Sequence, residues 1–192
     1  MGVIECGKKI RRLSGEDWLL SAIELLAEQG IGAVTVKGLA RILNVTRGSF
    51  YHHFRNRQDM LDQMLEYWNQ KWTMQIRESN KALALDPKDA LLALMRAIRH
   101  EHAADYDVAF RAWAQNDQIA MKVVQRVDKI RLDHIHGLFK KMGFKGMDAE
   151  NRTRLFLYYE MAEPMMFARS YKAQEEKLLI KRHRFLTTNI NN

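Results

Sequence analysis

The stretch TVKGLARILNVTRGSFYHHFRNRQD, residues 35–59, decides the fold of this chain. It holds two short segments with helical apolar periodicity, separated by a tight break at residues 43–45. An aromatic cluster of Phe50, Tyr51 and Phe54 ends the second segment. Two short helices joined by a tight turn are typical of a helix-turn-helix, whose second helix enters the DNA major groove. The sequence therefore predicts a small DNA-binding unit here.

The sequence around this stretch marks the starts of further helices. Ser14, followed three residues later by Asp17, predicts a capping box that begins a first helix, and Gly30 is a typical C-terminal stop for it. Residues able to cap a helix also stand before several later periodic segments. The expected caps are Thr35, Thr46, Asn56, Asp86 and Asn116 or Asp117. The helix after Asn56 is expected to be long, ending near Ser79.

The second half of the chain keeps the same helical character. Helices are expected over residues 87–102, 107–114, 117–141, from 147 onward, and over about 175–186. Pro164 is expected to kink or weaken the helix that contains it, because proline removes a backbone donor. No strand pattern is present. The predicted fold class is therefore all-α, with a helix-turn-helix domain in residues 1–56 and a larger helical domain in residues 57–192.

Composition supports this fold and limits the function classes. The chain has 192 residues, of which only two are proline and ten glycine, and such a composition favours helix. Lysine and arginine number 31 against 23 aspartate and glutamate, giving a net charge of +8. This balance fits a polyanionic partner, and it fits a solvated basic surface equally well. Cys6 is the only cysteine, which excludes a disulfide within the chain and a cysteine-based zinc site. No signal peptide or membrane span is recognised, so we expect a reducing cytoplasm.

The helix-turn-helix resembles the N-terminal domain of the tetracycline-repressor (TetR) family. The matching residues are Gly30, Thr35, Leu39-Ala40, Val45, Gly48-Ser49-Phe50-Tyr51, His53-Phe54 and Leu61. The resemblance implies a homodimer that binds a palindromic operator in double-stranded DNA, with the last two long helices of each subunit forming a four-helix interface. It also implies a C-terminal domain that binds a small-molecule effector. Residues 111–144 resemble the regulatory domain of some family members more loosely.

A recognition helix needs small residues at its start, long polar side chains facing outward and an apolar face toward its own domain. Phe50 and Phe54, four residues apart, are expected in the core, and Arg47 is the expected base contact because guanidinium matches guanine. The resemblance implies that Tyr51 and His53 bind phosphates and that Lys37 reaches a base or phosphate. The predicted DNA-binding set is Thr35, Lys37, Thr46, Arg47, Gly48, Ser49, Tyr51, His52, His53 and Arg57. A solvated polar face is the alternative, and for His52 alone the two interpretations are even.

Two residues of this region are unusual for their positions. Gly38 stands in the interior of an expected helix, and Arg57 stands at the start of the fourth helix. Glycine costs about 1 kcal/mol in a helix interior, and we interpret Gly38 as room for close approach of DNA, with simple tolerance of glycine at this position as the alternative. The family usually has lysine where this chain has Arg57, which is conservative if the side chain contacts phosphate.

The second half holds many methionines and aromatic residues, most of which are expected to be plain core. The fourth helix must touch both an effector pocket and the DNA-binding domain to couple them. The predicted pocket walls are Trp68, Trp72, Met95, Phe110 and Trp113. Glu160 and Glu163 could offer negative charge to a cationic ligand, or form a solvated or interface stripe. A dimer face is predicted at helical spacing from Leu155, Tyr158, Tyr159, Ala162 and Met166.

The chain shows no arrangement that indicates catalysis. His134 and His136 are two apart on a helix and face different directions, and no nucleophile–base pair or phosphate loop is present. We therefore expect no enzyme, no cofactor and no metal site. The predicted function is a DNA-binding transcriptional regulator, a repressor released from its operator by a small apolar or cationic effector. The alternatives are a helical protein–protein adaptor and an orphan DNA-binding regulator without effector, and the choice between repression and activation stays open.

Overall fold

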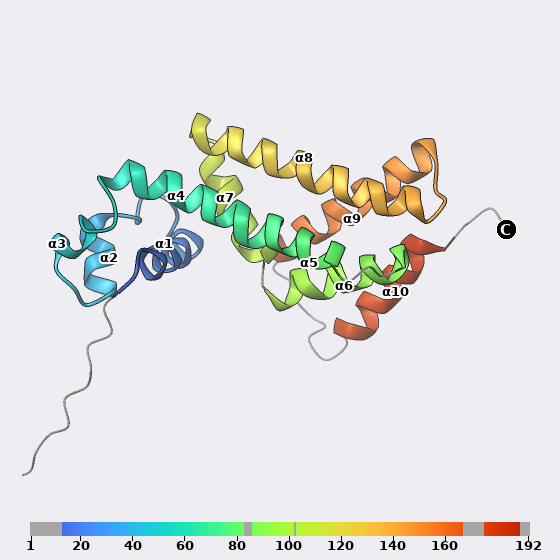
Figure 1. The fold of residues 1–192 in the computed structure, drawn as a ribbon, viewed down its shortest axis with the longest axis horizontal. Helices are drawn as coiled ribbons and strands as arrows, with labels where there is room; N and C mark the ends of the chain where they lie inside the picture. The colour runs from blue at the N-terminus through green and yellow to red at the C-terminus, as the bar shows by residue number, and fades with distance from the viewer. Residues whose placement is uncertain (1–12, 83–85, 102, 167–174, 189–192) are drawn as a thin grey trace, which may run out of the picture.

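The computed structural model describes residues 13–82, 86–101, 103–166 and 175–188. Within those ranges the chain is helical and contains no strand. The helices are α1 Gly15–Gln29, α2 Val36–Ile42, α3 Arg47–Phe50, α4 Arg57–Asn69, η1 Gln70–Gln75, α5 Ile76–Ala82, α6 Pro87–His100, α7 Ala103–Ala114, α8 Gln118–Lys141, α9 Gly146–Ala162, η2 Glu163–Met165 and α10 Glu175–Thr187. Helices α1 to α3 lie at one end of the molecule and α10 at the other (Figure 1).

The predicted helix starts in the N-terminal unit are confirmed. The Ser14 hydroxyl accepts from the Asp17 amide at 3.2 Å while the Ser14 amide donates to the Asp17 carboxylate at 2.7 Å. Thr35 Oγ1 accepts from the Gly38 amide at 3.0 Å, which caps α2. These bonds satisfy amides that a helix start leaves unpaired. Gly30 ends α1 with φ 77°, a conformation that disfavours any side chain.

A shared aromatic core holds α1, α2 and α3 together. Trp18, Leu39 and Phe50 are fully buried, and the Trp18 and Phe50 rings meet edge to face with centroids 5.4 Å apart. Phe54 is buried as well, as its spacing from Phe50 predicts. The break between α2 and α3 turns at Asn44, whose φ of 53° lies in the left-handed region. The helix-turn-helix architecture is therefore confirmed, with α3 shorter than the predicted helix.

A long helical rod, α4–η1–α5, links this unit to the rest of the chain (Figure 1). The sequence predicts one helix from Asn56 to about Ser79, and the rod runs slightly further, to Ala82. Its middle, Gln70–Gln75, is π-helical, which the sequence did not predict. Helices with π-turns are rare, and such turns often occur at functional sites.

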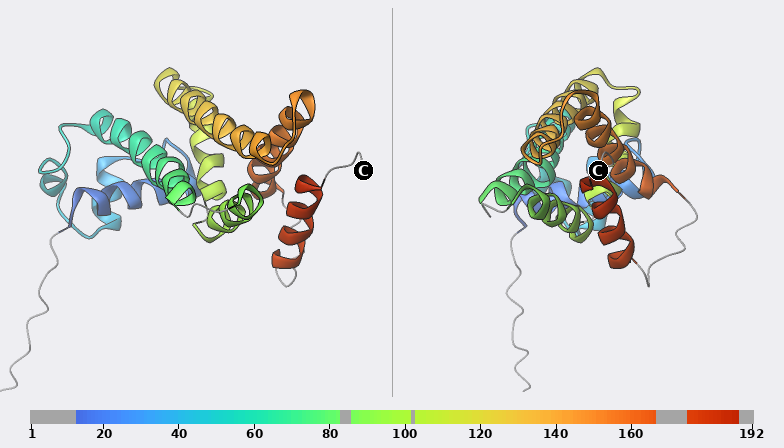
Figure 2. Two further views of the ribbon diagram at one scale, coloured as in Figure 1. Left: turned by 45° about the vertical axis from the view of Figure 1, so that its right-hand side comes forward. Right: turned by 90° about the vertical axis from the view of Figure 1, so that its right-hand side faces the viewer.

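A second core lies between α6, the second half of α8, α9 and α10, whereas the buried side chains of α7 and of the first half of α8 join the core that contains Trp18 and Phe50. Figure 2 shows α8 and α9 along one side of the molecule. α7 begins at Ala103, four residues before the predicted start at Asp107. α9 ends at Ala162 and Pro164 lies in the following short turn η2, so the proline follows the helix rather than kinking it. None of the described helices is long and apolar enough to cross a membrane.

Candidate nucleic-acid interface and ligand cavity

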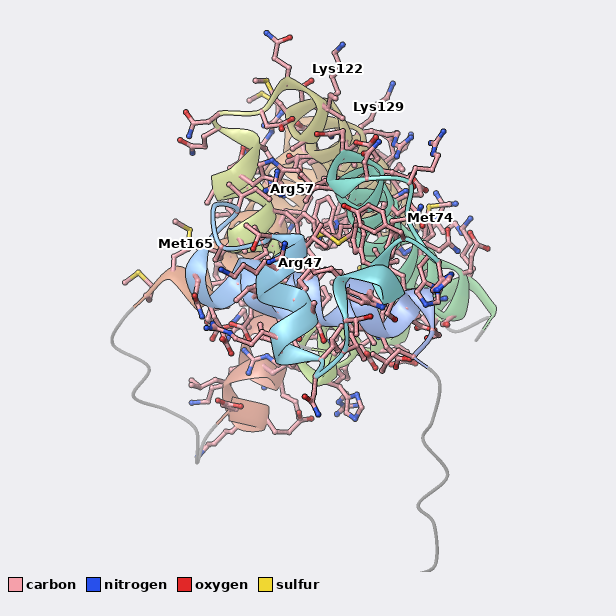
Figure 3. The ribbon with its side chains drawn as sticks, turned by 90° about the vertical axis from the view of Figure 1, so that its left-hand side faces the viewer. Arg47, Arg57, Met74, Lys122, Lys129 and Met165 are labelled. Atoms are coloured by element: carbon pink, nitrogen blue, oxygen red, sulfur yellow. The ribbon has the colours of Figure 1, made fainter. Side chains whose placement is uncertain are left out.

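The short helix α3 presents polar side chains from a buried aromatic base. Phe50 is fully buried, whereas the adjacent Tyr51 is 62% exposed, and Arg47 and His52 are exposed beside it. An aromatic residue left exposed next to a buried one needs a reason, since burial would stabilise it. Figure 3 looks onto this end of the molecule, where Arg47 lies on the viewer's side. This arrangement provides long polar side chains on a firmly packed support.

The small residues of the predicted set surround this helix start. Thr46 is the N-cap of α3, and its hydroxyl makes no cap hydrogen bond. Gly48 is exposed, which leaves the backbone accessible, and Ser49 is half-buried. His53 is half-buried against α1, where its Cβ lies 3.9 Å from the position a Cβ would take on Gly15. The structure thus brings these residues to one end, with His53 and Ser49 the least exposed.

The start of α2 lies on the same unit. Lys37 and Thr35 are exposed, and Thr35 already uses its hydroxyl as the cap. A Cβ on Gly38 would stand 3.0 Å from Thr35 Oγ1, closer than ordinary contact. The cap therefore explains Gly38, and the interpretation as room for DNA is not needed. Arg41, exposed and four residues after Lys37, shares its face and was missed, although this spacing could have indicated it.

Arg57 holds a loop together, a role the sequence interpretation did not include. Its Nε donates to the Val34 carbonyl at 2.6 Å and its Nη2 to the Ile31 carbonyl at 3.1 Å. Both carbonyls belong to the connector between α1 and α2, so Arg57 fixes the start of α2 from the start of α4. Charged donors make hydrogen bonds about twice as strong as neutral ones. The phosphate contact of Arg57 stays a prediction.

An apolar cavity of about 60 Å³ lies in the second half of the molecule. It is bounded by η1, α5, α6, α7, α8 and α9. Its lining residues are Trp72, Thr73, Ile76, Arg77, Leu94, Ile98, Ala103, Ala104, Asp107, Ile130, Arg131, His134, Ile135, Phe156, Leu157, Glu160 and Met161. The linking rod contributes directly to the wall through Trp72, Thr73 and Ile76.

Only Trp72 of the five predicted wall residues lines this cavity. Trp68 is fully buried and stacks on Phe110 with ring centroids 4.7 Å apart, and Phe110 in turn packs near Trp113. Met95 is buried in the second core. These four residues serve as core because neighbouring rings fill the space beside them, which helical spacing alone does not reveal.

Glu160 is the carboxyl that faces the cavity. It is 6% exposed, and its nearest described cation is Arg182, whose Nη1 lies 3.6 Å from Oε1. Burial raises the pKa of Glu160 to about 7, with Arg182 and Arg99 opposing the shift. Glu163 lies outside the cavity and accepts from Arg99 at 2.9 Å and from the Tyr159 hydroxyl at 3.0 Å. The two carboxylates therefore have different surroundings, although they are three residues apart.

The cavity wall contains further polar side chains that the sequence analysis missed. Asp107 is 3% exposed and pairs with Arg131, which also donates from Nε to Thr73 Oγ1 at 3.0 Å. His134 lies 3.2 Å from the Asn80 side chain, and burial lowers its pKa, assisted by nearby cations. A charged residue between apolar neighbours in a helix, such as Arg131, was the available signal.

A surface groove of about 250 Å³ adjoins the cavity. Ile76 and Leu94 line both, so they form the partition between groove and cavity. The groove has a polar rim that includes Lys71 and Glu101. It lies between the linking rod and α6, on the other side of Ile76 and Leu94 from the cavity.

The predicted dimer face is exposed in the single chain. Leu155 is 54% exposed, Tyr158 52% and Met166 62%, and Ala162 is exposed with them. Tyr159 is less open, because the Arg182 guanidinium lies 3.5 Å above its ring. An apolar strip of this kind on a helix is typical of an interaction surface. No group of three or more metal-ligating side chains occurs among the described residues.

The chain is similar to known proteins both in part of its sequence and in its fold. Residues 19–64 match the model of the family described as bacterial regulatory proteins, tetR family. The repressor KstR2 of Rhodococcus jostii is 34% identical over 87 residues, and KstR2 of Mycobacterium tuberculosis is 31% identical over 86 residues. Each match covers 43% of this chain and 42% of the relative, so the chain matches less than half of these relatives' length.

The fold over most of the chain is similar to that of solved regulators. A transcriptional regulator from Rhodococcus sp. Rha1 has a TM-score of 0.71 at 19% identity, covering 91% of this chain and 94% of that one. The TetR-family regulator PfmR from Thermus thermophilus has a TM-score of 0.70 at 20% identity, covering 91% and 99%. At these identities the similarity shows the shared fold.

Proposed function

We propose that this chain, which belongs to the TetR family of bacterial regulatory proteins, is a sequence-specific DNA-binding transcriptional regulator. The observation that carries the proposal is the exposed set of Arg47 on α3 and Tyr51 and His52 directly after it, supported by Phe50, which is fully buried. Such a support keeps the backbone rigid while polar side chains reach base edges and phosphates.

The regulator acts as a homodimer through the strip that contains Leu155 and Tyr158 on α9 and Met166 directly after η2, with α8 beside it. Two copies related by a twofold axis present two α3 helices to one face of the DNA. Half-sites about 34–36 Å apart then match successive major grooves, which requires a palindromic operator.

A small molecule in the cavity releases the operator in this proposal, and the protein acts as a repressor, as the named function of KstR2 suggests. The apolar lining selects an apolar body. Glu160 favours a cationic or hydrogen-bond-donating group, because a buried carboxylate gains from a compensating charge. The cavity of about 60 Å³ admits only a small group unless the partition at Ile76 and Leu94 moves toward the groove.

Residues 1–56 form the DNA-binding domain and residues 57–192 the effector and dimer domain in this proposal. The regulator has no enzymatic role and works in the cytoplasm. An adaptor without operator binding would not need Arg47 and Tyr51 exposed together at α3 and its C-terminal end. An orphan regulator would not need a cavity wall built partly from the rod that carries the DNA-binding unit.

Selection of sites from a random duplex pool tests the proposal. The wild-type chain should enrich a palindrome whose half-site centres lie about one helical turn, or a multiple of it, apart. Enrichment of no motif, with binding that depends on salt alone, would favour the adaptor or a nonspecific basic surface.

A further inference from the structure

We propose that Asp107 and Arg131, two charged residues in the cavity wall, position the π-helical stretch of the linking rod and so connect the cavity to the DNA-binding unit. The inference rests on the proposed function and assigns the coupling to particular side chains. It makes Arg131 and Asp107 positioning residues that act on DNA binding through the rod.

The contacts join α7 and α8 to two segments of the rod, α4 and η1, at one point. The Asp107 carboxylate on α7 accepts from Trp68 Nε1 on α4 at 2.9 Å and from Arg131 Nη2 on α8 at 3.2 Å. Arg131 also pairs with Asp107 through Nη1, and its Nε donates to Thr73 Oγ1 in η1 at 3.0 Å. One ion pair therefore holds the rod at Trp68 and Thr73, five residues apart, on either side of the junction between α4 and η1.

Packing by itself does not explain this ion pair. Trp68 is fully buried and stacked on Phe110, so its ring has a fixed place without the hydrogen bond. Buried ion pairs are often no more stabilising than apolar side chains of similar size, since desolvation offsets their attraction. Their directional bonds do fix geometry, and here they fix the rod.

The rod is irregular at the place where it is held. Residues Gln70–Gln75 form the π-helix, and Thr73 lies within it. A π-turn widens the helix and alters the course of the segments on either side. Trp72, in the same stretch, donates from Nε1 to the Glu101 carbonyl at 3.3 Å. The direction in which α4 leaves toward the DNA-binding unit therefore depends on contacts made at the cavity.

An occupant of the cavity would meet the same polar atoms. Thr73, Asp107 and Arg131 all line it. A ligand with an apolar body and a hydrogen-bonding group competes with Thr73 for Arg131 or with Trp68 for Asp107. The rod then has two arrangements, and a ligand shifts their balance only by binding one of them better.

Two substitutions test the network while keeping the buried ion pair. Trp68→Phe removes the indole N–H that Asp107 accepts, and Thr73→Val removes the acceptor for Arg131 with little change of shape. Thr153→Val is the control for the second, because the Thr153 hydroxyl donates to the Ala149 carbonyl at 2.7 Å and lies 3.4 Å from His136 Nδ1 on α8, and neither contact involves the rod.

Trp18→Phe is the control for the first substitution. Trp18 is as buried as Trp68, but its Nε1 has no hydrogen-bond partner among the described residues. The change therefore removes ring volume without breaking a bond. Circular dichroism and thermal melting confirm that each full-length variant is folded before the test.

Hydrogen–deuterium exchange at residues 70–75 and affinity for the duplex selected by wild type are the two measurements. Trp68→Phe and Thr73→Val should each speed exchange at 70–75 about tenfold, as expected for loss of a bond to a charged group. Both should also change DNA affinity at least about threefold, within the range of typical coupling. Trp18→Phe should leave exchange at 70–75 unchanged, and Thr153→Val should leave both measurements unchanged.

Three results would overturn the inference. Exchange at 70–75 equal to that of the controls would show that the network does not hold the rod. Faster exchange with wild-type DNA affinity would show that it holds the rod without reaching the DNA-binding unit. A wild-type chain that selects no DNA would remove the proposed function and the coupling with it, a failure that is visible before any variant is made.

Discussion

The N-terminal three-helix unit and the cavity-bearing half are both helical, but they differ in what fixes them. In the first, caps and a turn lie close in sequence to the side chains they orient, as when Thr35 caps α2 beside Lys37. In the second, a cavity wall is assembled from segments as distant as Thr73 and Glu160. Local signals therefore locate the candidate DNA interface, and only packing locates the cavity.

The largest predicted effect comes from removing a buried side chain of the core that α1, α2 and α3 share. Phe50→Ala should lower the free energy of unfolding by about 3–5 kcal/mol, since a fully buried ring is lost and a cavity remains. Hydrogen exchange should show the loss in α1 to α3 more than in α8 and α9. Equal loss of protection in both halves would contradict the separate character of the N-terminal unit.

The predicted dimer face lies in the second half, and a charge placed in it should prevent dimerisation without unfolding the first half. Leu155→Glu places a charge in the predicted interface and should weaken dimerisation by about 2–4 kcal/mol if this residue is an interface hot spot. Phe185→Glu is the control, because Phe185 is 64% exposed on α10, outside the predicted face. Sedimentation velocity measures both. A wild-type monomer at micromolar concentration would remove the interface.

Glu160 should make the second half sensitive to pH. Its pKa is raised from 4.5 to about 7, so the folded state binds a proton that the unfolded state has released. Stability should therefore fall as pH rises from 4.5 to 7, by at most about 3 kcal/mol. Glu160→Gln should flatten this fall, whereas Glu163→Gln, which keeps Glu160, should retain it. Thermal melts across that pH range measure it, and equal slopes in wild type and Glu160→Gln would contradict the assignment.

The smallest predicted effect is that of replacing Arg57, which lies at the start of α4, between the N-terminal unit and the cavity-bearing half. If it contacts phosphate as predicted, Arg57→Ala should reduce the slope of log affinity against log salt by about one. Because its guanidinium also holds the Ile31 and Val34 carbonyls, the variant should melt earlier as well. Arg55→Ala is the control, since Arg55 is exposed and paired with Asp59. An unchanged slope with a lower melting temperature would make Arg57 a structural residue only.

Much of the fold could be predicted from the sequence because its signals are short-range. The capping box at Ser14, the cap at Asn56 and the turn at Asn44 each depend on a few neighbouring residues. The π-helix and the early start of α7 could not, because both depend on tertiary contacts such as the bond from Arg131 to Thr73.

The predictions for the two candidate sites differ for the same reason. Arg47 on α3 and Tyr51 directly after it are exposed, as the amphipathic pattern predicts. Of the predicted wall residues only Trp72 lines the cavity, because Trp68 and Trp113 pack with Phe110; the role of this set in binding an effector stays a prediction. An apolar helical pattern identifies buried residues, but it does not distinguish core from cavity lining.

The central claim is that α3 selects a DNA sequence through Arg47, and paired site selection tests it most directly. Wild type and Arg47→Ala are taken through the same random duplex pool and their enriched motifs are compared. The account predicts a palindrome for wild type and loss of preference at one position in each half-site for the variant. Identical motifs from the two proteins, or no motif from wild type, would contradict it.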